Sequence, residues 1–225
     1  MQKNMFKGVI FDLDGTLVNS LGDITNAINT VLKTHNFPTL TVQECQSFIG
    51  HGVKDLVVKA LPKDHRSDEW INRCFHEMLA VYRDNCTIKT ELYPGISNLL
   101  DELTARKLKL AVFSNKADEL TKKVVKAVCS KWNFEVVEGL KIEALKKPNP
   151  TVAIEISKKL NIPAEQLIFV GDTDVDIITA KKSNMYPVGV VWGYRTKEEL
   201  VLSGAKYMLE NPLDLIQLLE SNKAS

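Results

Sequence analysis

Short apolar runs alternate with amphipathic stretches over most of this chain. Apolar residues cluster over the length of a strand at 9–11, 109–113, 134–137, 167–170 and 188–191. Apolar residues recur with helical spacing at 96–106, 120–128, 151–160 and 174–184, and in a last helix that opens at Asn211-Pro212 and runs through Leu219. Because strands that alternate with helices are typical of βαβ units, the pattern predicts a parallel sheet covered by helices.

The segment between the first strand and residue 91 has a different pattern. It contains no convincing strand, and helical spacing recurs at 21–32, after the capping-box pattern Thr41–Glu44, at 53–61 and at 70–82. We therefore predict an α/β fold with two parts. Residues 1–18 and 91–225 form a doubly wound, Rossmann-like parallel-sheet core, and residues 19–90 form an all-helical domain inserted after the first strand.

The composition of the chain argues against several classes of binding partner. A formal net charge of +1 gives no bulk field that would recruit nucleic acid or an anionic membrane. No apolar run is long enough to span a bilayer. The cysteines lie far apart without a Cys-x-x-Cys spacing, which argues against a zinc site and a disulfide framework; they are Cys45, Cys74, Cys86 and Cys129. Since Met1–Lys7 is too short and polar for a signal peptide, we expect reduced thiols in a cytoplasmic protein.

Polar side chains follow several of the predicted strands at their carboxyl ends. Asp12 and Asp14 follow the first strand, directly before a turn-forming glycine. The other candidates are Ser114 and Asn115, Asp172 and Asp176, and Lys147 in a basic loop. Each alone has a plain structural explanation as a turn, a helix cap or a surface charge. Because the carboxyl ends of parallel strands meet at one edge of a sheet, we expect these groups to share one crevice.

The charges in such a crevice predict a metal ion. Four carboxylates, Asp12, Asp14, Asp172 and Asp176, would repel one another by about 4 kcal/mol per pair at ~4 Å and an effective dielectric near 20. A divalent cation relieves that repulsion, and a ligand set of oxygens without His or Cys favours Mg²⁺. A lysine and a hydroxyl beside Mg²⁺ form a phosphate clamp, where one carboxylate can attack phosphorus and its neighbour can protonate the leaving oxygen.

Four segments resemble the motifs of the haloacid dehalogenase superfamily, and they occur in the order of that family. They are Phe11–Leu17, Ser114-Asn115-Lys116, Lys147–Pro150 and Gly171–Asp176. The resemblance covers nearly the whole chain, and the helical insertion is similar to the cap domain of the family. Within the superfamily the chain is most similar to phosphoglycolate phosphatases, through Gly50-His51-Gly52 and Val191-Trp192-Gly193-Tyr194.

The resemblance implies roles for individual residues. Asp12 is the nucleophile that becomes an aspartyl phosphate, and Asp14 is the general acid and then the base, with its backbone carbonyl as a metal ligand. Ser114 and Lys147 hold the transferring phosphoryl group, with help from Asn115. Asp172 binds Mg²⁺ directly and Asp176 supports the metal. The implied function is Mg²⁺-dependent hydrolysis of a small phosphorylated metabolite, with 2-phosphoglycolate as the first candidate.

The chain departs from the family pattern in places that leave the substrate open. Ser114 stands where many relatives carry Thr, which keeps the hydroxyl, and His51 stands where Asn is common in the phosphoglycolate branch. Gly50, His51, Gly52 and Lys54 in the insertion are candidates for binding a second anionic group of the substrate. A plain turn between helices with a solvated lysine explains the same residues.

Other functions stay open on the sequence alone. A sugar phosphomutase and a pyrophosphatase of the same superfamily are alternatives. A dehalogenase is disfavoured because a halide leaves without the proton that Asp14 would supply. A non-enzymatic phospho-acceptor signalling domain also combines Asp, Mg²⁺, a hydroxyl and Lys, but it has no use for the helical insertion. The oligomeric state, monomer or homodimer, is not predicted.

Overall fold

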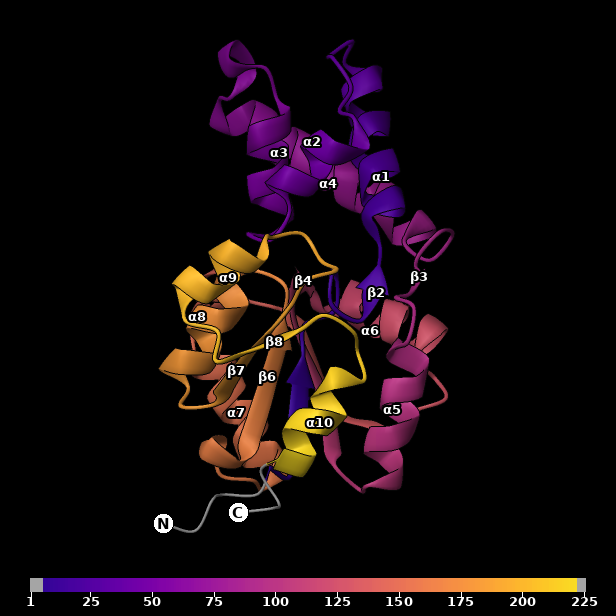
Figure 1. The fold of residues 1–225 in the computed structure, drawn as a ribbon. Helices are drawn as coiled ribbons and strands as arrows, with labels where there is room; N and C mark the ends of the chain where they lie inside the picture. The colour runs from indigo at the N-terminus through magenta and orange to yellow at the C-terminus, as the bar shows by residue number, and fades with distance from the viewer. Residues whose placement is uncertain (1–5, 222–225) are drawn as a thin grey trace.

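Six parallel strands form the central sheet of this protein in the computed structural model, which describes residues 6–221 (Figure 1). The sheet order is β5-β4-β1-β6-β7-β8. The strands are β1 (Gly8–Phe11), β4 (Lys109–Ala117), β5 (Phe134–Leu140), β6 (Leu167–Gly171), β7 (Tyr186–Val190) and β8 (Tyr207–Leu209). From β1 the chain adds strands outward on one side and then on the other. The expected doubly wound sheet is confirmed, and its switch point beside β1 is where such sheets bind ligands.

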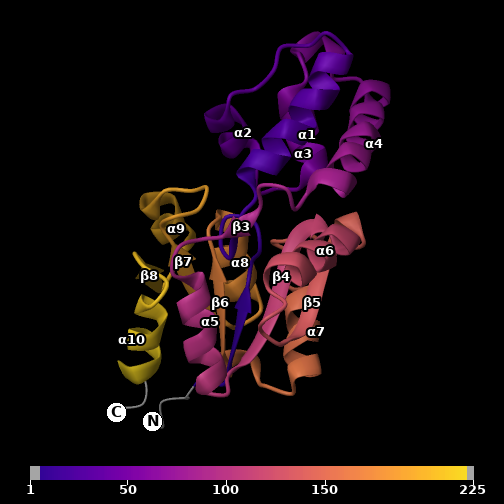
Figure 2. The same cartoon turned by 90° about the vertical axis from the view of Figure 1, so that its right-hand side faces the viewer.

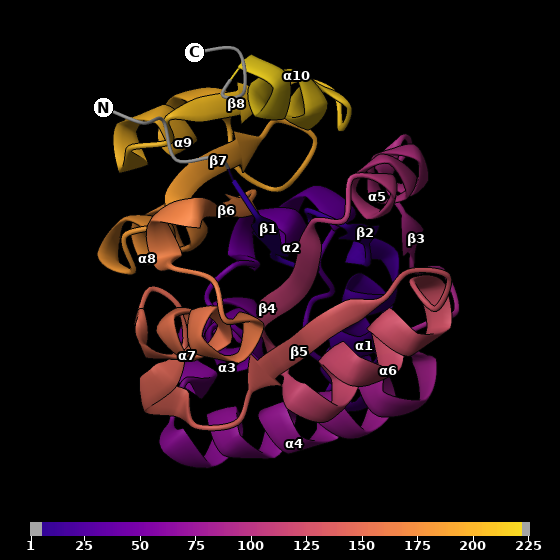
Figure 3. The same cartoon turned by 90° about the horizontal axis from the view of Figure 1, so that it is seen from below.

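Helices cover both faces of the sheet (Figures 2 and 3). One face carries α5 (Ile96–Ala105), α6 (Asp118–Val128) and α10 (Asp214–Ser221), and the other carries α7 (Thr151–Leu160), α8 (Asp174–Lys182) and α9 (Lys197–Ser203). Successive residues of β1 enter opposite cores, since Val9 and Phe11 pack in one apolar cluster and Ile10 in the other. Burial on both faces explains why the central strands are unbroken apolar runs.

Four helices lie beyond the carboxyl ends of the strands (Figure 1). These cap helices are α1 (Leu21–Thr34), α2 (Val42–Phe48), α3 (Val53–Ala60) and α4 (Asp68–Asn85). Two chain connections join the cap helices to the sheet. These connections pair with each other as the antiparallel strands β2 (Val18–Asn19) and β3 (Glu91–Leu92). The buried Asp23 of α1 binds the outgoing connection, because its Oδ2 accepts hydrogen bonds from the backbone N–H and the hydroxyl of Thr90. Our domain boundaries at 18/19 and 90/91 stay a prediction.

Element boundaries follow local capping chemistry. The expected capping box at α2 is confirmed, with Thr41 Oγ1 accepting from Glu44 N–H and Glu44 Oε2 accepting from Thr41 N–H. The last helix begins at Asp214, later than expected, because residues 211–216 first form tighter turns, in which the N–H groups of Asp214, Leu215 and Ile216 each donate to the carbonyl three residues before. Short 3₁₀ helices, which we did not predict, are η1 (Lys63–His65), η2 (Glu143–Leu145) and η3 (Ala164–Gln166). Within residues 6–221, none of the helices combines the length and the apolar character needed to cross a bilayer.

Candidate active site

A pocket lies between the cap helices and the carboxyl ends of the central strands. With its open mouth it has an empty volume of about 580 Å³. The cap side contributes Ile24, Ile49, Gly50, Gly52, Val53, Leu56, Met78 and Tyr82. The sheet side contributes Asp12, Asp14, Ser114, Asn115, Lys116, Lys147 and Thr173. Most of the polar residues predicted from the strand ends therefore meet in one crevice.

Three carboxylates gather at one end of this crevice. Oxygens of Asp12, Asp172 and Asp176 all lie within 4.8 Å of one another, and all three side chains are buried. Asp172 is fixed by two hydrogen bonds, from the Thr16 hydroxyl to Oδ1 (2.9 Å) and from the Tyr194 N–H to Oδ2 (2.8 Å). The loops after β1 and β6 thus place acids that are about 160 residues apart in the sequence side by side.

The turn after β1 needs glycine for this approach. Gly15 has a φ of +90°, a conformation that costs residues with a Cβ atom. A Cβ at this position would also lie 2.3 Å from Asp172 Oδ2. Gly15 therefore serves both the turn and the close packing of the Asp172 carboxylate.

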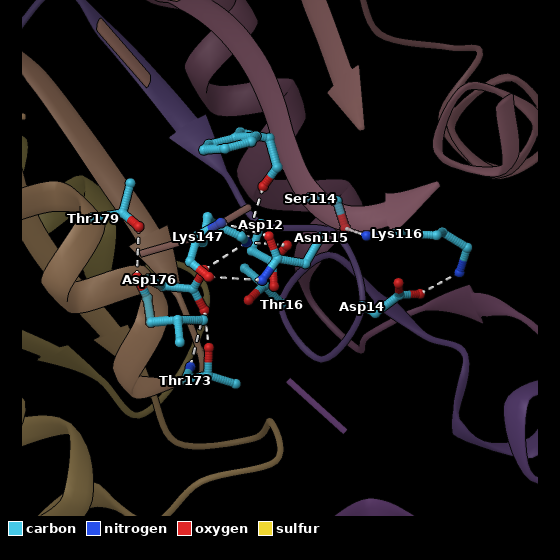
Figure 4. Close-up of polar contacts among 12 residues, drawn as sticks. Asp12, Asp14, Thr16, Ser114, Asn115, Lys116, Lys147, Thr173, Asp176 and Thr179 are labelled. Carbon is cyan, nitrogen blue, oxygen red and sulfur yellow. Dashed lines mark hydrogen bonds and ion pairs between the residues drawn. The ribbon is translucent and has the colours of Figure 1, made fainter. Parts of the chain in front are cut away.

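Lys147 is the cation that neutralises part of the acidic cluster. Its ammonium lies 2.7 Å from Asp12 Oδ1 and 2.6 Å from Asp176 Oδ1, and it also donates to the backbone oxygen of Phe113 at 3.1 Å (Figure 4). Burial alone would lower the pKa of Lys147, but the two carboxylates outweigh it and hold the pKa above its usual value. Lys147 is therefore a permanent positive charge, with its donors used by these partners.

The remaining negative charge perturbs Asp12 and Asp172. Burial raises the pKa of Asp12 from 3.8 to about 7, with Lys147 opposing and Asp176 reinforcing the shift. Burial, together with the charges of Asp12 and Asp176, also raises the pKa of Asp172 well above its usual value. Both carboxyls are thus costly to ionise without further positive charge.

The cluster fits a divalent cation with oxygen ligands. Three carboxylates and the Lys147 ammonium carry a formal charge of −2 when ionised. Asp12 Oδ1 is buried and has no hydrogen-bond donor in suitable geometry among the described residues, although it pairs with Lys147 as an ion. An all-oxygen donor set suits Mg²⁺ better than zinc.

Asp176 and Asp14 have contacts that the sequence did not predict when we expected four carboxylates to converge. Asp176 Oδ2 accepts hydrogen bonds from the N–H and the hydroxyl of Thr173, so Asp176 also caps α8 and orients Lys147. The Asp14 carboxylate does not join the cluster. Its Oδ1 accepts from Ser20 Oγ at 2.5 Å and from Lys116 Nζ at 2.7 Å, so our expectation holds for three of the four side chains.

Ser114 and Asn115 connect the loops around the pocket. The helix-cap explanation of these residues is wrong, because β4 continues through them and α6 is capped at Ala117. Asn115 Oδ1 accepts the Lys147 N–H at 2.8 Å, and its amide group donates to the backbone oxygens of Lys147 (3.2 Å) and Gly50 (3.3 Å). Asn115 therefore links the Lys147 loop to the cap, while Ser114 lines the pocket.

The cap loop is only partly where the sequence suggested. Gly50 and Gly52 line the pocket with φ values of +122° and +91°. The two side chains expected to bind an anion do not line it. His51 lies 4.0 Å from Asp174 with 40% of its side chain exposed, and Lys54 is exposed on α3. The spacing predicted the turn but not the direction of these side chains.

Three polar residues of the pocket, Tyr82, Lys116 and Thr173, were missed as site residues by the sequence analysis. Lys116 Nζ donates to Asp14 Oδ1 and to the Tyr82 hydroxyl, at 2.7 and 2.6 Å. Lys116 belongs to the segment Ser114-Asn115-Lys116, so its place in that motif was a usable signal. Tyr82 followed the apolar spacing of α4, and nothing in that spacing revealed a polar contact across the pocket.

Comparisons with known proteins agree with this geometry. A phosphoglycolate phosphatase of Aquifex aeolicus (strain VF5) is 32% identical over 95% of this chain and 97% of its own. One from Colwellia psychrerythraea (strain 34H) is 31% identical over 92% of this chain and 94% of its own. A crystal structure of a candidate phosphoglycolate phosphatase from Lactobacillus delbrueckii subsp. bulgaricus superposes with a TM-score of 0.87 at 28% identity, covering 95% of this chain and 98% of that one. The sequence profile of the haloacid dehalogenase-like hydrolases matches residues 9–190, and the chain belongs to that family.

Proposed function

We propose that this protein is a Mg²⁺-dependent phosphatase that hydrolyses a small phosphorylated metabolite through an aspartyl phosphate on Asp12. The observation that carries the proposal is the buried cluster of Asp12, Asp172 and Asp176, paired with Lys147, where Asp12 and Lys147 line the pocket. Family membership supports the reaction class, since the relatives compared above are named phosphoglycolate phosphatases.

The residues of the cluster would hold the metal ion. Asp12 and Asp172 would bind the ion directly, the backbone carbonyl of Asp14 would be a third ligand, and Asp176 would support the site. When bound, the ion supplies positive charge that offsets the carboxylates and the phosphoryl oxygens. Lys147 adds a second positive charge beside Asp12, and the hydroxyl of Ser114 would orient the phosphoryl group. Asn115 assists by holding the Lys147 loop in place, since its amide hydrogen-bonds the backbone of Lys147 and Gly50.

In the first step an Asp12 carboxylate oxygen attacks phosphorus. The bond from phosphorus to the ester oxygen breaks, and Asp14, in its protonated form, gives its proton to the leaving oxygen. The products are an aspartyl phosphate on Asp12 and a free alcohol. Asp14 suits this role because it lines the pocket but stands apart from the three clustered carboxylates.

In the second step water attacks the phosphorus of the aspartyl phosphate. Asp14, now ionised, takes a proton from that water, and the Asp12 carboxylate leaves. Inorganic phosphate departs and both residues return to their starting forms. A phosphomutase would instead pass the phosphoryl group to another hydroxyl of a sugar.

The pocket supports a small substrate. Its mostly apolar cap side offers few partners to a large polar leaving group, and the names of the relatives make 2-phosphoglycolate the first substrate to test. The cysteines Cys45, Cys74, Cys86 and Cys129 are all free and buried, which supports the proposed cytoplasmic location.

Steady-state phosphate release tests the proposal. The protein is assayed with p-nitrophenyl phosphate and 2-phosphoglycolate, with Mg²⁺ or with a chelator. We expect hydrolysis that requires Mg²⁺ and is lost in Asp12→Asn, with Lys54→Met as the matched variant outside the pocket. Metal-independent hydrolysis, or full activity of folded Asp12→Asn, would contradict the proposed mechanism.

A further inference from the structure

Lys116 is a second buried cation at the pocket, distinct from Lys147. In Figure 4, Lys116 and Asp14 lie to one side of Asp12, and Lys147 and Asp176 lie to the other. The Lys116 side chain is 3% exposed, yet it lines the pocket. Its ammonium joins Asp14 of the sheet side to the Tyr82 hydroxyl of the cap helix α4.

The two lysines differ in their partners, and an ammonium group has three N–H donors. Lys147 hydrogen-bonds Asp176 Oδ1 and the Phe113 carbonyl, and it forms an ion pair with Asp12 Oδ1, so its neighbours belong to the acidic cluster and to β4. Among the described residues, Lys116 Nζ has two acceptors, Asp14 Oδ1 and Tyr82 Oη. One donor of Lys116 therefore remains for a ligand in the pocket.

The position of Lys116 relates to the leaving group of the substrate. In the proposed reaction, Asp14 meets the ester oxygen, so the carbon attached to that oxygen lies near the partner of Asp14. That partner is Lys116, 2.7 Å from Asp14. Beyond it the cap side of the pocket is apolar, formed by Ile24, Ile49, Val53, Leu56 and Met78. An anionic group on the leaving alcohol would thus find its positive charge at Lys116.

We propose that Lys116, held by Tyr82, recognises a carboxylate borne by the carbon next to the ester oxygen of the substrate. This inference rests on the proposed phosphatase function and assigns to Lys116 the selection of short phosphorylated 2-hydroxy acids, the class to which 2-phosphoglycolate belongs. It replaces the expectation that His51 and Lys54 bind the second anion, since neither side chain lines the pocket. Lys116 is a specificity-determining residue, and Tyr82 is a positioning residue that acts through it.

The first test compares two substrates on the wild-type protein. 2-Phosphoglycolate and its neutral amide, 2-phosphoglycolamide, share the ester and differ in the charge of one group. We expect kcat/KM for the acid to exceed that for the amide by about 10- to 100-fold, because only the acid forms a hydrogen bond between two charged groups with Lys116. Equal kcat/KM values for the acid and the amide would overturn the proposal.

Variants then identify which residue causes the preference for the acid. Lys116→Met keeps an apolar side chain of similar length but removes the charge, so the preference should fall to within about threefold of unity. Lys126→Met, exposed on α6 and outside the pocket lining, is the matched control and should retain the wild-type preference. Tyr82→Phe should lower the preference partway, through a higher KM for the acid alone. The ratio between substrates is the readout, because Lys116 also contacts Asp14 and its loss changes the rate for both.

The outcomes separate this inference from the function on which it rests. If wild-type protein hydrolyses none of the phosphate esters with Mg²⁺, the phosphatase proposal fails. If it hydrolyses p-nitrophenyl phosphate but does not favour the acid over the amide, only the role of Lys116 fails. A preference retained by folded Lys116→Met would also overturn that role, and its loss in Lys54→Met would then assign the recognition to the cap loop. Should Lys116→Met not fold, as judged by circular dichroism, the wild-type comparison and Tyr82→Phe decide.

Discussion

Replacing Asp12 by Asn should stabilise the metal-free protein above neutral pH, although it removes the proposed nucleophile. Burial raises the pKa of Asp12 from 3.8 to about 7. Because the folded state binds the proton more tightly than the unfolded chain does, the contribution of Asp12 to stability is fully present below pH 3.8. It is lost as the pH rises through about 7. Asparagine has a similar shape and no charge to bury.

The magnitude follows from the two pKa values. Each pKa unit corresponds to about 1.4 kcal/mol, so ionising Asp12 costs the folded protein about 4 kcal/mol near pH 8 and about 2 kcal/mol near pH 5. Lys147 keeps Asp176 and the Phe113 carbonyl as partners in the variant. Neutralising Asp12 also removes one of the charges that raise the pKa of Asp172.

Urea unfolding with a chelator present measures the effect. The free energy of unfolding of Asp12→Asn should exceed that of the wild type by a few kcal/mol near pH 8 and by less near pH 5, with unchanged m-values. Mg²⁺ should reduce the difference in the free energy of unfolding between Asp12→Asn and the wild type near pH 8, because it stabilises the wild type. A variant that is less stable than the wild type at about pH 8, or a gain independent of pH, would refute the electrostatic reasoning.

Three further predictions follow from the same contacts. Asp172→Ala removes a proposed metal ligand and should raise the Mg²⁺ concentration for half-maximal activity by a large factor, and Asp176→Ala by less; an unchanged Mg²⁺ titration would place the metal elsewhere. Asp14→Asn should slow single-turnover phosphoryl transfer by about 10²- to 10⁴-fold for an alkyl phosphate and less for p-nitrophenyl phosphate, and equal losses would argue against a general acid. Lys147→Met leaves Asp12 and Asp176 without their cation and should lower the free energy of unfolding near neutral pH by about 3–5 kcal/mol. An unchanged free energy of unfolding would show that these ion pairs do not stabilise the protein.

The fold was predictable where local pattern and tertiary burial agree. Strands β1, β4 and β6 are covered on both faces, so their apolar runs stand out in the sequence. The edge strand β8 was missed because Tyr207 and Met208 are only partly buried and the strand has three residues. Helix α9 was missed although Thr196 and Glu199 form the same capping box that identified α2.

The site was predictable where the backbone alone directs a side chain. Residues at the carboxyl ends of β1, β4 and β6 reach the crevice because the sheet topology brings those ends together. The contact between Lys116 and Tyr82 depends instead on how α4 packs over the sheet, which local spacing does not determine. The same reason explains why the sequence predicted the loop of His51 but not the orientation of its side chain, which lies near Asp174 and not in the pocket lining.

The most direct test of the account is to trap the phosphorylated enzyme. The protein is mixed with 2-phosphoglycolate or p-nitrophenyl phosphate and Mg²⁺, quenched with acid during turnover, digested, and analysed by mass spectrometry. The account predicts one phosphoryl group on the peptide that contains Asp12, absent when Mg²⁺ is chelated and absent in Asp12→Asn. Rapid turnover with an unmodified Asp12 peptide at every quench time, or phosphorylation at another residue, would contradict it.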